Sequence, residues 1–286
     1  MISSVVSGGL DADPTPGTGG AYRRPCPVCG NGGYRVVMEH SPWVLGRCDT
    51  CGMAYLPEVP APEVFEDDLE WDQSFRQERL RRWLNSPWAR LWTALLLVVK
   101  PDRAKRALQH VRALRGPGRM LEIGCGDGRL AALALKQGYD PLGVELSPAM
   151  VRKAQSRLGA ERVRQGRVEA LDLAGEAFDL CVGVSVVEHE PQPLAMLEHV
   201  RTLLKPGGTL ALKTPNYDSW LRRLRGRRWS GYRWPEHVQY FTPRTLGRLV
   251  ERAGFEVVRV LASPLSDNFW LGARLAAEVP PRTPPA

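Results

Sequence analysis

The sequence lacks a long apolar run. Its longest uninterrupted stretch, Ala94 to Val99, is far shorter than the roughly 20 residues that a membrane-spanning helix needs, so no transmembrane segment is expected. The amino terminus also lacks a basic start followed by an apolar core, the pattern of an export signal. We therefore expect a cytoplasmic protein, in which disulfides are an uncommon use of cysteine.

Acidic residues are fewer than basic ones, 31 against 39, which gives a formal net charge of +8. This balance favours anionic partners without choosing among nucleic acid, a nucleotide-linked sugar, anionic lipid or an acidic small molecule. At 286 residues the chain has room for one domain of ordinary size and a smaller unit.

Cysteine is also scarce, and four of the six residues fall into two tight pairs. The pairs are Cys26 with Cys29 and Cys48 with Cys51, and each is followed by a glycine that permits a sharp bend. This spacing is typical of a zinc ribbon, with an iron centre or a redox pair as alternatives. Four thiolates leave no coordination position open, so we predict a structural zinc ion.

Three glycines at alternate positions interrupt an apolar run at Met120 to Gly128. We predict a buried strand over 119–123, a turn, and a helix over 128–137. Such a turn can hold a nucleotide against its backbone. The dinucleotide fingerprint requires a third glycine where this chain has Arg129, which disfavours an oxidoreductase.

From Gly118 onward, apolar strands alternate with helical patterns, which predicts a parallel sheet covered on both faces. Further strands are expected near 141–145, 162–168, 178–184 and 208–214, further helices near 148–158 and 192–203, and a final antiparallel hairpin over 256–261 and 268–273.

The motif Glu122-Ile-Gly124-Cys-Gly126-Asp-Gly128 resembles the first motif of class I S-adenosylmethionine-dependent methyltransferases. The resemblance extends from residue 26 to about residue 262. It implies an α/β fold, a Rossmann-like seven-stranded mostly parallel sheet with helices on both faces, and S-adenosylmethionine as cofactor.

Glu145 ends the second predicted strand, 23 residues after Glu122, where its carboxylate can accept hydrogen bonds from both hydroxyls of a ribose. The alternative is an acid that caps the next helix. Together with the resemblance, these positions predict a donor site formed by Glu122, Gly124, Gly126, Gly128, Glu145, Leu146, Val168, Glu169 and Ser185.

Two histidines are candidate catalytic bases. His189 follows the fourth predicted strand and is either a base or a wall residue, whereas His237 lies in a passage that recurs in similar methyltransferases. A buried structural histidine is the alternative for His237. Arginines and aromatics alternate over residues 220–241, which we interpret as a substrate lid, with a single-stranded nucleic-acid surface as the alternative.

The predicted organisation is an arm at 1–21, a zinc ribbon at 22–57, a helical connector or cap at 58–117, a methyltransferase domain at 118–275 and a tail at 276–286. The predicted function is methylation of an anionic or phosphate-bearing small molecule, such as a sugar, polyketide or cell-envelope precursor, on oxygen, nitrogen or carbon. An RNA methyltransferase is the alternative. A ribbon that recruits a partner protein and a peripheral membrane contact through the aromatic stripe at 83–95 are also open.

Overall fold

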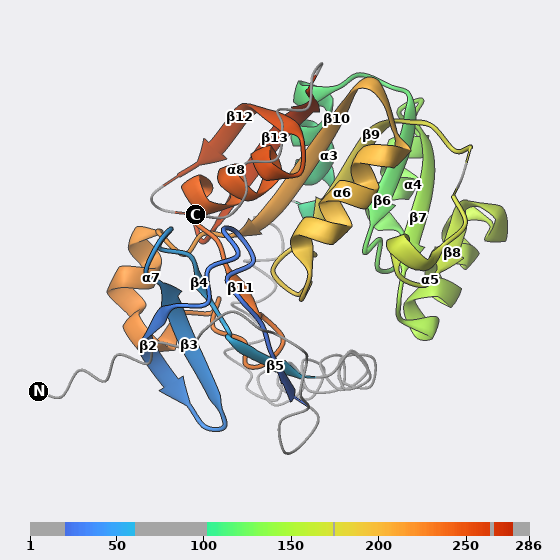
Figure 1. Cartoon of the computed structure of the whole chain (residues 1–286). Helices are drawn as coiled ribbons and strands as arrows, with labels where there is room; N and C mark the ends of the chain where they lie inside the picture. The colour runs from blue at the N-terminus through green and yellow to red at the C-terminus, as the bar shows by residue number, and fades with distance from the viewer. Residues whose placement is uncertain (1–20, 61–101, 174, 264–265, 277–286) are drawn as a thin grey trace, which may run out of the picture.

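The computed structural model describes residues 21–60, 102–173, 175–263 and 266–276 of the 286-residue chain. Its centre is a seven-stranded sheet (Figure 1). In spatial order the strands are β12 (Phe255–Ala262), β13 (Asn268–Leu275), β10 (Leu204–Pro215), β9 (Phe178–Val184), β6 (Arg119–Ile123), β7 (Asp140–Glu145) and β8 (Val163–Gln165).

Six of these seven strands point the same way. The pairs β10–β9, β9–β6, β6–β7 and β7–β8 are parallel, and β13 is antiparallel to both β10 and β12. The mostly parallel sheet and its antiparallel edge hairpin confirm the predicted fold class. Because the chain runs from β6 outward to β8 and then returns to β9 on the other side of β6, the strand order reverses between β6 and β9. Ligands of such sheets bind at this reversal, beyond the carboxyl ends of the strands.

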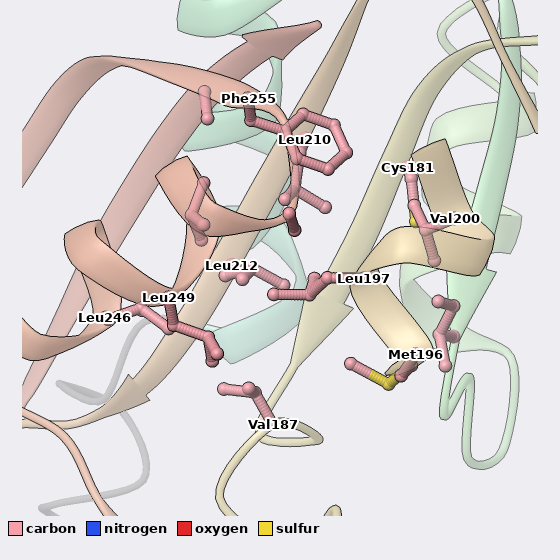
Figure 2. Packing of buried hydrophobic residues seen from close by; sticks show 14 of the residues in the cluster. Cys181, Val187, Met196, Leu197, Val200, Leu210, Leu212, Leu246, Leu249 and Phe255 are labelled. Carbon is pink, nitrogen blue, oxygen red and sulfur yellow. The ribbon is translucent and has the colours of Figure 1, made fainter. Parts of the chain in front are cut away.

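Helices cover both faces because neighbouring strand residues point to opposite sides. Met120, Leu180 and Ala211 pack with three helices, α3 (Arg103–Leu114), α4 (Arg129–Leu135) and α5 (Pro148–Leu158). The residues next to them in sequence, Leu121, Cys181, Leu210 and Leu212, pack on the other face with α6 (Pro193–Leu203) and α8 (Pro243–Arg252). Figure 2 shows Leu197 of α6 and Leu249 of α8 meeting β10 over this face.

Local sequence signals set the helix ends. The Ser147 hydroxyl accepts from the Met150 amide at the start of α5, and Pro148 occupies the first turn, where its missing N–H costs nothing. At the start of α8, Thr242 and Thr245 form a reciprocal capping box. These caps orient the helices that cover the two faces of the sheet.

The cysteine-bearing unit has two small sheets. One has the order β11-β4-β3-β2, with β2 (Tyr34–His40), β3 (Trp43–Cys48), β4 (Ala54–Tyr55) and β11 (Gln239–Tyr240), and the other pairs β1 (Ala21–Arg23) with β5 (Glu58–Pro60). Strands β2 and β3 occupy most of the sequence between Cys29 and Cys48. Because β11 comes from the far end of the chain, this unit and the predicted lid share one sheet, and a third core that includes Leu45 and Trp229 lies between them.

The prediction for the third strand was wrong in extent. Strand β8 ends at Gln165, and a 3₁₀ turn at Val168–Ala170 follows Gly166, whose φ of 137° lies outside the range of strand residues. Residues 1–20 of the predicted arm, residues 277–286 of the predicted tail and the aromatic stripe at 83–95 lie outside the described residues. Ala21, predicted to end the arm, instead begins β1. Among the residues that are described, no helix combines the length and apolarity needed to cross a membrane.

Candidate active site

The three glycines of the turn between β6 and α4 have different surroundings. All three have positive φ, at 64°, 55° and 73°. A Cβ at position 124 would lie 2.6 Å from Cγ2 of Val186, and one at position 128 would lie 2.9 Å from Cδ1 of Leu158. A Cβ at Gly126 would meet nothing within 4 Å. The outer glycines therefore permit close packing, and Gly126 faces the open space that a bound ligand requires.

The end of β7 meets this turn. One carboxylate oxygen of Glu145, Oε2, accepts from the Gly126 amide at 2.8 Å, and the other, Oε1, accepts from the amides of Leu146 and Ser147 at 2.9 and 3.0 Å. The carboxylate is thus fixed by three backbone amides and remains partly exposed. A carboxylate has about four acceptor positions, so further donors such as hydroxyls can still bind.

Glu122 lies beneath the turn, with 4% of its surface exposed. Its Oε2 is buried and has no hydrogen-bond partner among the described residues. Burial, opposed by a hydrogen bond from the Ala131 backbone and supported by the negative charges of Glu145 and Asp127, raises the pKa of Glu122 to about 8. A buried acceptor of this kind suits a ligand that brings a donor or a positive charge.

Two of the predicted donor-site residues, Val168 and Glu169, lie on the 3₁₀ turn after β8. The side chain of Val168 is buried in the core at 2% exposure, so only its backbone is available to a ligand. Glu169 forms an ion pair with Arg167 at 3.8 Å, and Arg167 forms a shorter one with Glu190 at 2.6 Å. Arg167 thereby ties this turn to the loop after β9.

That loop begins at Ser185, which has a φ of 58°, a conformation that non-glycine residues seldom adopt. Its amide donates to the Lys213 carbonyl at 2.8 Å, and its hydroxyl accepts from Lys213 Nζ at 2.8 Å. Further along the loop, Glu188 is buried, and its Oε2 accepts from the Thr214 hydroxyl at 2.9 Å. Lys213 was missed by sequence reasoning because it is a single polar residue in an apolar strand.

The two predicted catalytic histidines come together although 48 positions separate them. Their ring centroids are 4.6 Å apart and their planes perpendicular, and with Glu188 they offer ligand atoms within 4.8 Å of one another. His237 is buried, with Nδ1 2.8 Å from the Gly231 carbonyl. That contact requires Nδ1 to donate, which leaves Nε2 as the acceptor. Burial, followed by the neighbouring His189, holds the pKa of His237 well below its usual value.

A neutral His237 can accept a proton. The carboxylate of Glu188 and the imidazoles of His189 and His237 are also groups that can together coordinate a divalent cation.

The predicted lid is anchored rather than open. Trp229 is buried in the third core, and its indole nitrogen donates to Asp267 at 2.9 Å. Aromatic side chains of this passage pack on one another and on the cysteine-bearing unit. The short helix α7 (Trp220–Arg225) stays at the surface, with Trp220 66% exposed.

A buried arginine that sequence reasoning missed joins three segments. The guanidinium of Arg24 donates to the carbonyls of Leu56, Pro191 and Val238 at 3.0, 2.6 and 2.8 Å. These carbonyls belong to the cysteine-bearing unit, the loop after β9 and the segment that leads into β11. Arg24 therefore couples that unit to the loop that carries Glu188 and His189.

The four paired cysteines form one cluster. The Sγ atoms of Cys26 and Cys51 are 3.5 Å apart, as are those of Cys29 and Cys48, and all four lie within 4.8 Å of one another. Tetrahedral zinc with Zn–S bonds of about 2.3 Å places its sulfurs slightly under 4 Å apart. The amides of Gly30 and Gly52 donate back to the Cys26 and Cys48 carbonyls, as the predicted bends require. The cluster has the shape of a closed tetrathiolate site.

Comparison with known proteins identifies related chains. The model of a methyltransferase-domain family matches residues 98–260, a range that excludes the four paired cysteines. A ubiquinone biosynthesis O-methyltransferase of Cereibacter sphaeroides is 34% identical over 171 residues, covering 54% of this chain and 68% of the relative. The protein of the same description from Dinoroseobacter shibae is 33% identical over 188 residues, covering 59% and 75%.

Solved structures give a matching result. A methyltransferase from Thermotoga maritima, described as S-adenosylmethionine-dependent and a possible histamine N-methyltransferase, aligns with a TM-score of 0.50 at 27% identity, covering 60% of this chain and 89% of that one. The CcbJ methyltransferase of Streptomyces caelestis aligns with a TM-score of 0.52 at 19% identity, covering 62% and 97%, and shows the shared fold alone.

Proposed function

Because this chain belongs to the methyltransferase-domain family and is an S-adenosylmethionine-dependent methyltransferase, we propose that it methylates an oxygen of a small-molecule acceptor. The meeting of the Gly126 turn with the Glu145 carboxylate carries the donor half of this proposal. The O-methyltransferase names of the Cereibacter and Dinoroseobacter relatives support oxygen as the methylated atom.

The donor site that we propose uses residues at the carboxyl ends of four strands, β6, β7, β8 and β9. Glu145 would accept from the ribose hydroxyls, and Gly126 would let the ligand lie against its backbone. Glu122 would receive a donor or a positive charge at its unpartnered Oε2. Leu146, the turn at Val168 and Glu169, and Ser185 would border the adenosine and the methyl group, as the resemblance implies. This fit depends on the open space at Gly126 and on the buried Oε2 of Glu122, which has no hydrogen-bond partner among the described residues.

The bound cofactor supplies an electrophilic methyl group with its own leaving group. What the protein must add is alignment of the acceptor, exclusion of water and removal of a proton. Glu188 and His189 lie on the loop after β9, and His237, which joins them in the cluster, lies just before β11. We propose that this cluster borders the acceptor and that the proton leaves on this side of the site.

The acceptor that we favour is small and anionic, such as a phosphate-bearing sugar or an acidic phenol, because the chain has an excess of basic residues. The RNA alternative has less support, because several arginines near α7 are engaged within the protein. Arg223 pairs with Asp218, Arg225 pairs with Asp267, and Arg222 lies over the ring of Tyr217. A steep dependence of RNA affinity on salt would restore that alternative.

Calorimetry with S-adenosylmethionine and with a nicotinamide dinucleotide tests the donor half. We expect micromolar binding of the former only. Glu145→Ala removes charged hydrogen bonds, which contribute about 1.5–3 kcal/mol each, so affinity should fall at least tenfold. Glu256→Ala, which removes an exposed carboxylate from the far edge strand β12, is the matched control and should bind normally. If the native protein is indifferent to S-adenosylmethionine, the assignment is refuted.

We further propose that the four paired cysteines hold a structural zinc ion, supported by the spacing of their sulfurs. A reducing compartment such as the cytoplasm would keep the thiols available. Elemental analysis should find about one zinc ion per chain, and Cys48→Ser should lose it. Cys181→Ser, at a buried cysteine outside the cluster, should keep its zinc.

A further inference from the structure

Lys213 lies level with the glycine turn, two strands away. In the sheet register Ile123 pairs with Gly183, which pairs with Leu212. One residue further along each strand, Gly124, Val184 and Lys213 therefore share one level at the carboxyl ends of β6, β9 and β10. Neighbouring strands are about 4.8 Å apart, so Lys213 is roughly 10 Å across the sheet from the turn. A nucleoside lying against Gly126 and extending toward β9 would bring its reactive end beside Lys213.

The loop after β9 holds the amine in this position. Ser185 adopts its uncommon positive φ while its amide bonds to the Lys213 carbonyl, and the same residue's hydroxyl accepts from Lys213 Nζ at 2.8 Å. This double attachment fixes both the backbone and the amine of one residue to one loop. Unusual backbone conformations that the surrounding structure enforces are typical of ligand-binding sites. The amine of Lys213 is therefore held in one place by Ser185, whereas the amine of an ordinary surface lysine moves freely.

The charged groups around Lys213 come from three elements. Glu188, on the loop after β9, is buried and favours the protonated amine, whereas Arg103, at the start of α3, disfavours it. His237, near β11, interacts with the lysine charge from a third side. Burial lowers the pKa of Lys213 from its usual value. The negative charge of Glu188 opposes this effect, and the positive charge of Arg103 adds to it. Lys213 nevertheless remains partly exposed, unlike His237, whose Nδ1 is also engaged by Gly231.

We propose that Lys213 is the general base of the reaction and that its Nζ contacts the acceptor hydroxyl. The hydroxyl proton passes to Nζ, a lone pair of the acceptor oxygen forms the new bond to the methyl carbon, and the electrons of the broken carbon–sulfur bond leave with the sulfur. This inference rests on the proposed O-methyltransferase function. It assigns His189 and His237 to the wall behind the amine.

Lysine labelled with ¹³C at Cε provides a test that needs no acceptor. Lys213 is one of six lysines, so the resonance lost in Lys213→Arg identifies it. We expect this resonance to titrate at lower pH than the other five and to shift when S-adenosylhomocysteine binds. Glu188→Gln should lower its midpoint further, because a charge that favours the ammonium form is lost. Titration together with the other lysines, or no response to the nucleoside, would overturn the proposal.

Turnover separates a base from a structural cation. With 4-nitrocatechol as the probe acceptor, Lys213→Arg should lose about 10²–10⁴-fold in kcat, since an arginine stays protonated. Its affinity for S-adenosylmethionine should be unchanged, and kcat of the native enzyme should rise with pH through the Lys213 midpoint. Full activity of Lys213→Arg with an unchanged pH profile would refute the role of base.

Failure of the proposed function would look different. A native protein that does not bind S-adenosylmethionine refutes the methyltransferase assignment and the lysine's role together. A native protein that binds the donor but does not methylate the probe counts against a phenolic acceptor. The lysine titration then decides the proposal by itself.

Discussion

Glu122 should make the stability of this protein depend on pH. Its carboxyl group has a pKa of about 8 in the folded protein, compared with 4.5 for an exposed glutamate. Between these values the unfolded chain loses its proton and the folded chain keeps it, so unfolding becomes easier as pH rises. The stabilisation is complete below pH 4.5 and is lost as pH rises through about 8.

The magnitude follows from the size of the shift. Each pKa unit corresponds to 1.36 kcal/mol, so 2.5 units between pH 4.5 and 7 amount to about 3 kcal/mol, and the full shift to about 5 kcal/mol. Glu122→Gln keeps the shape of the side chain and removes the ionisation. Relative to the native protein, the variant should gain about 3 kcal/mol in free energy of unfolding between pH 4.5 and 7.

Urea unfolding at several pH values measures this difference. Other groups titrate alike in the two proteins, so their contributions cancel in the comparison. A constant offset between the two proteins could arise from altered hydrogen bonding and would leave the prediction intact. Parallel curves of stability against pH would refute it, because they would mean that Glu122 ionises in the folded state as it does in water.

Three further predictions concern the donor site and the fold. Binding of the cationic S-adenosylmethionine near neutral pH should expel a proton from Glu122, seen as a dependence of the calorimetric enthalpy on buffer that Glu122→Gln abolishes. Gly126→Ala should cost about 1–2 kcal/mol in stability and weaken donor binding, because its Cβ enters the open space. Gly128→Ala should cost more stability, because its Cβ meets Leu158. Urea unfolding measures the stability of the two variants and calorimetry their donor binding; equal stability losses would contradict this assignment. Arg24→Met leaves three carbonyls without their donor and should cost about 3 kcal/mol or more. Arg152→Met, at an exposed arginine of α5, is the control. A thermal midpoint equal to that of the control would count against the coupling role of Arg24.

Elements whose signals are local were predicted well from the sequence. The run from Met120 to Ile123 and the glycines after it are strand β6 and its turn, because apolar residues next to glycine specify both over a few positions. The second and fourth strands and the helix at 148–158 follow from the same periodicity. The third strand was predicted too long because a glycine with positive φ overrides the β propensity of its neighbours.

The meeting of strand ends that forms the proposed donor site was also predictable from the sequence. Parallel strands end at the same edge of a sheet, so the end of β6 and the end of β7 had to lie side by side once both strands were recognised. The bond from the Gly126 amide to Glu145 is the outcome of that rule. In the same way, two pairs of cysteines with bends after them suffice to predict one four-sulfur cluster.

The surroundings of the proposed acceptor site were decided by tertiary structure. Lys213 and Ser185 are 28 positions apart, His189 and His237 are 48 apart, and Arg24 reaches Val238 across 214 positions. No local periodicity records such contacts, because they depend on which strands become neighbours and on how β11 joins β4. The sequence by itself determined the strands, the turn and the cysteine cluster, since short-range sterics and burial specify them. The neighbourhood of strands β9 and β10, and the packing of the cysteine-bearing unit against the sheet, decided which polar groups surround the proposed acceptor site.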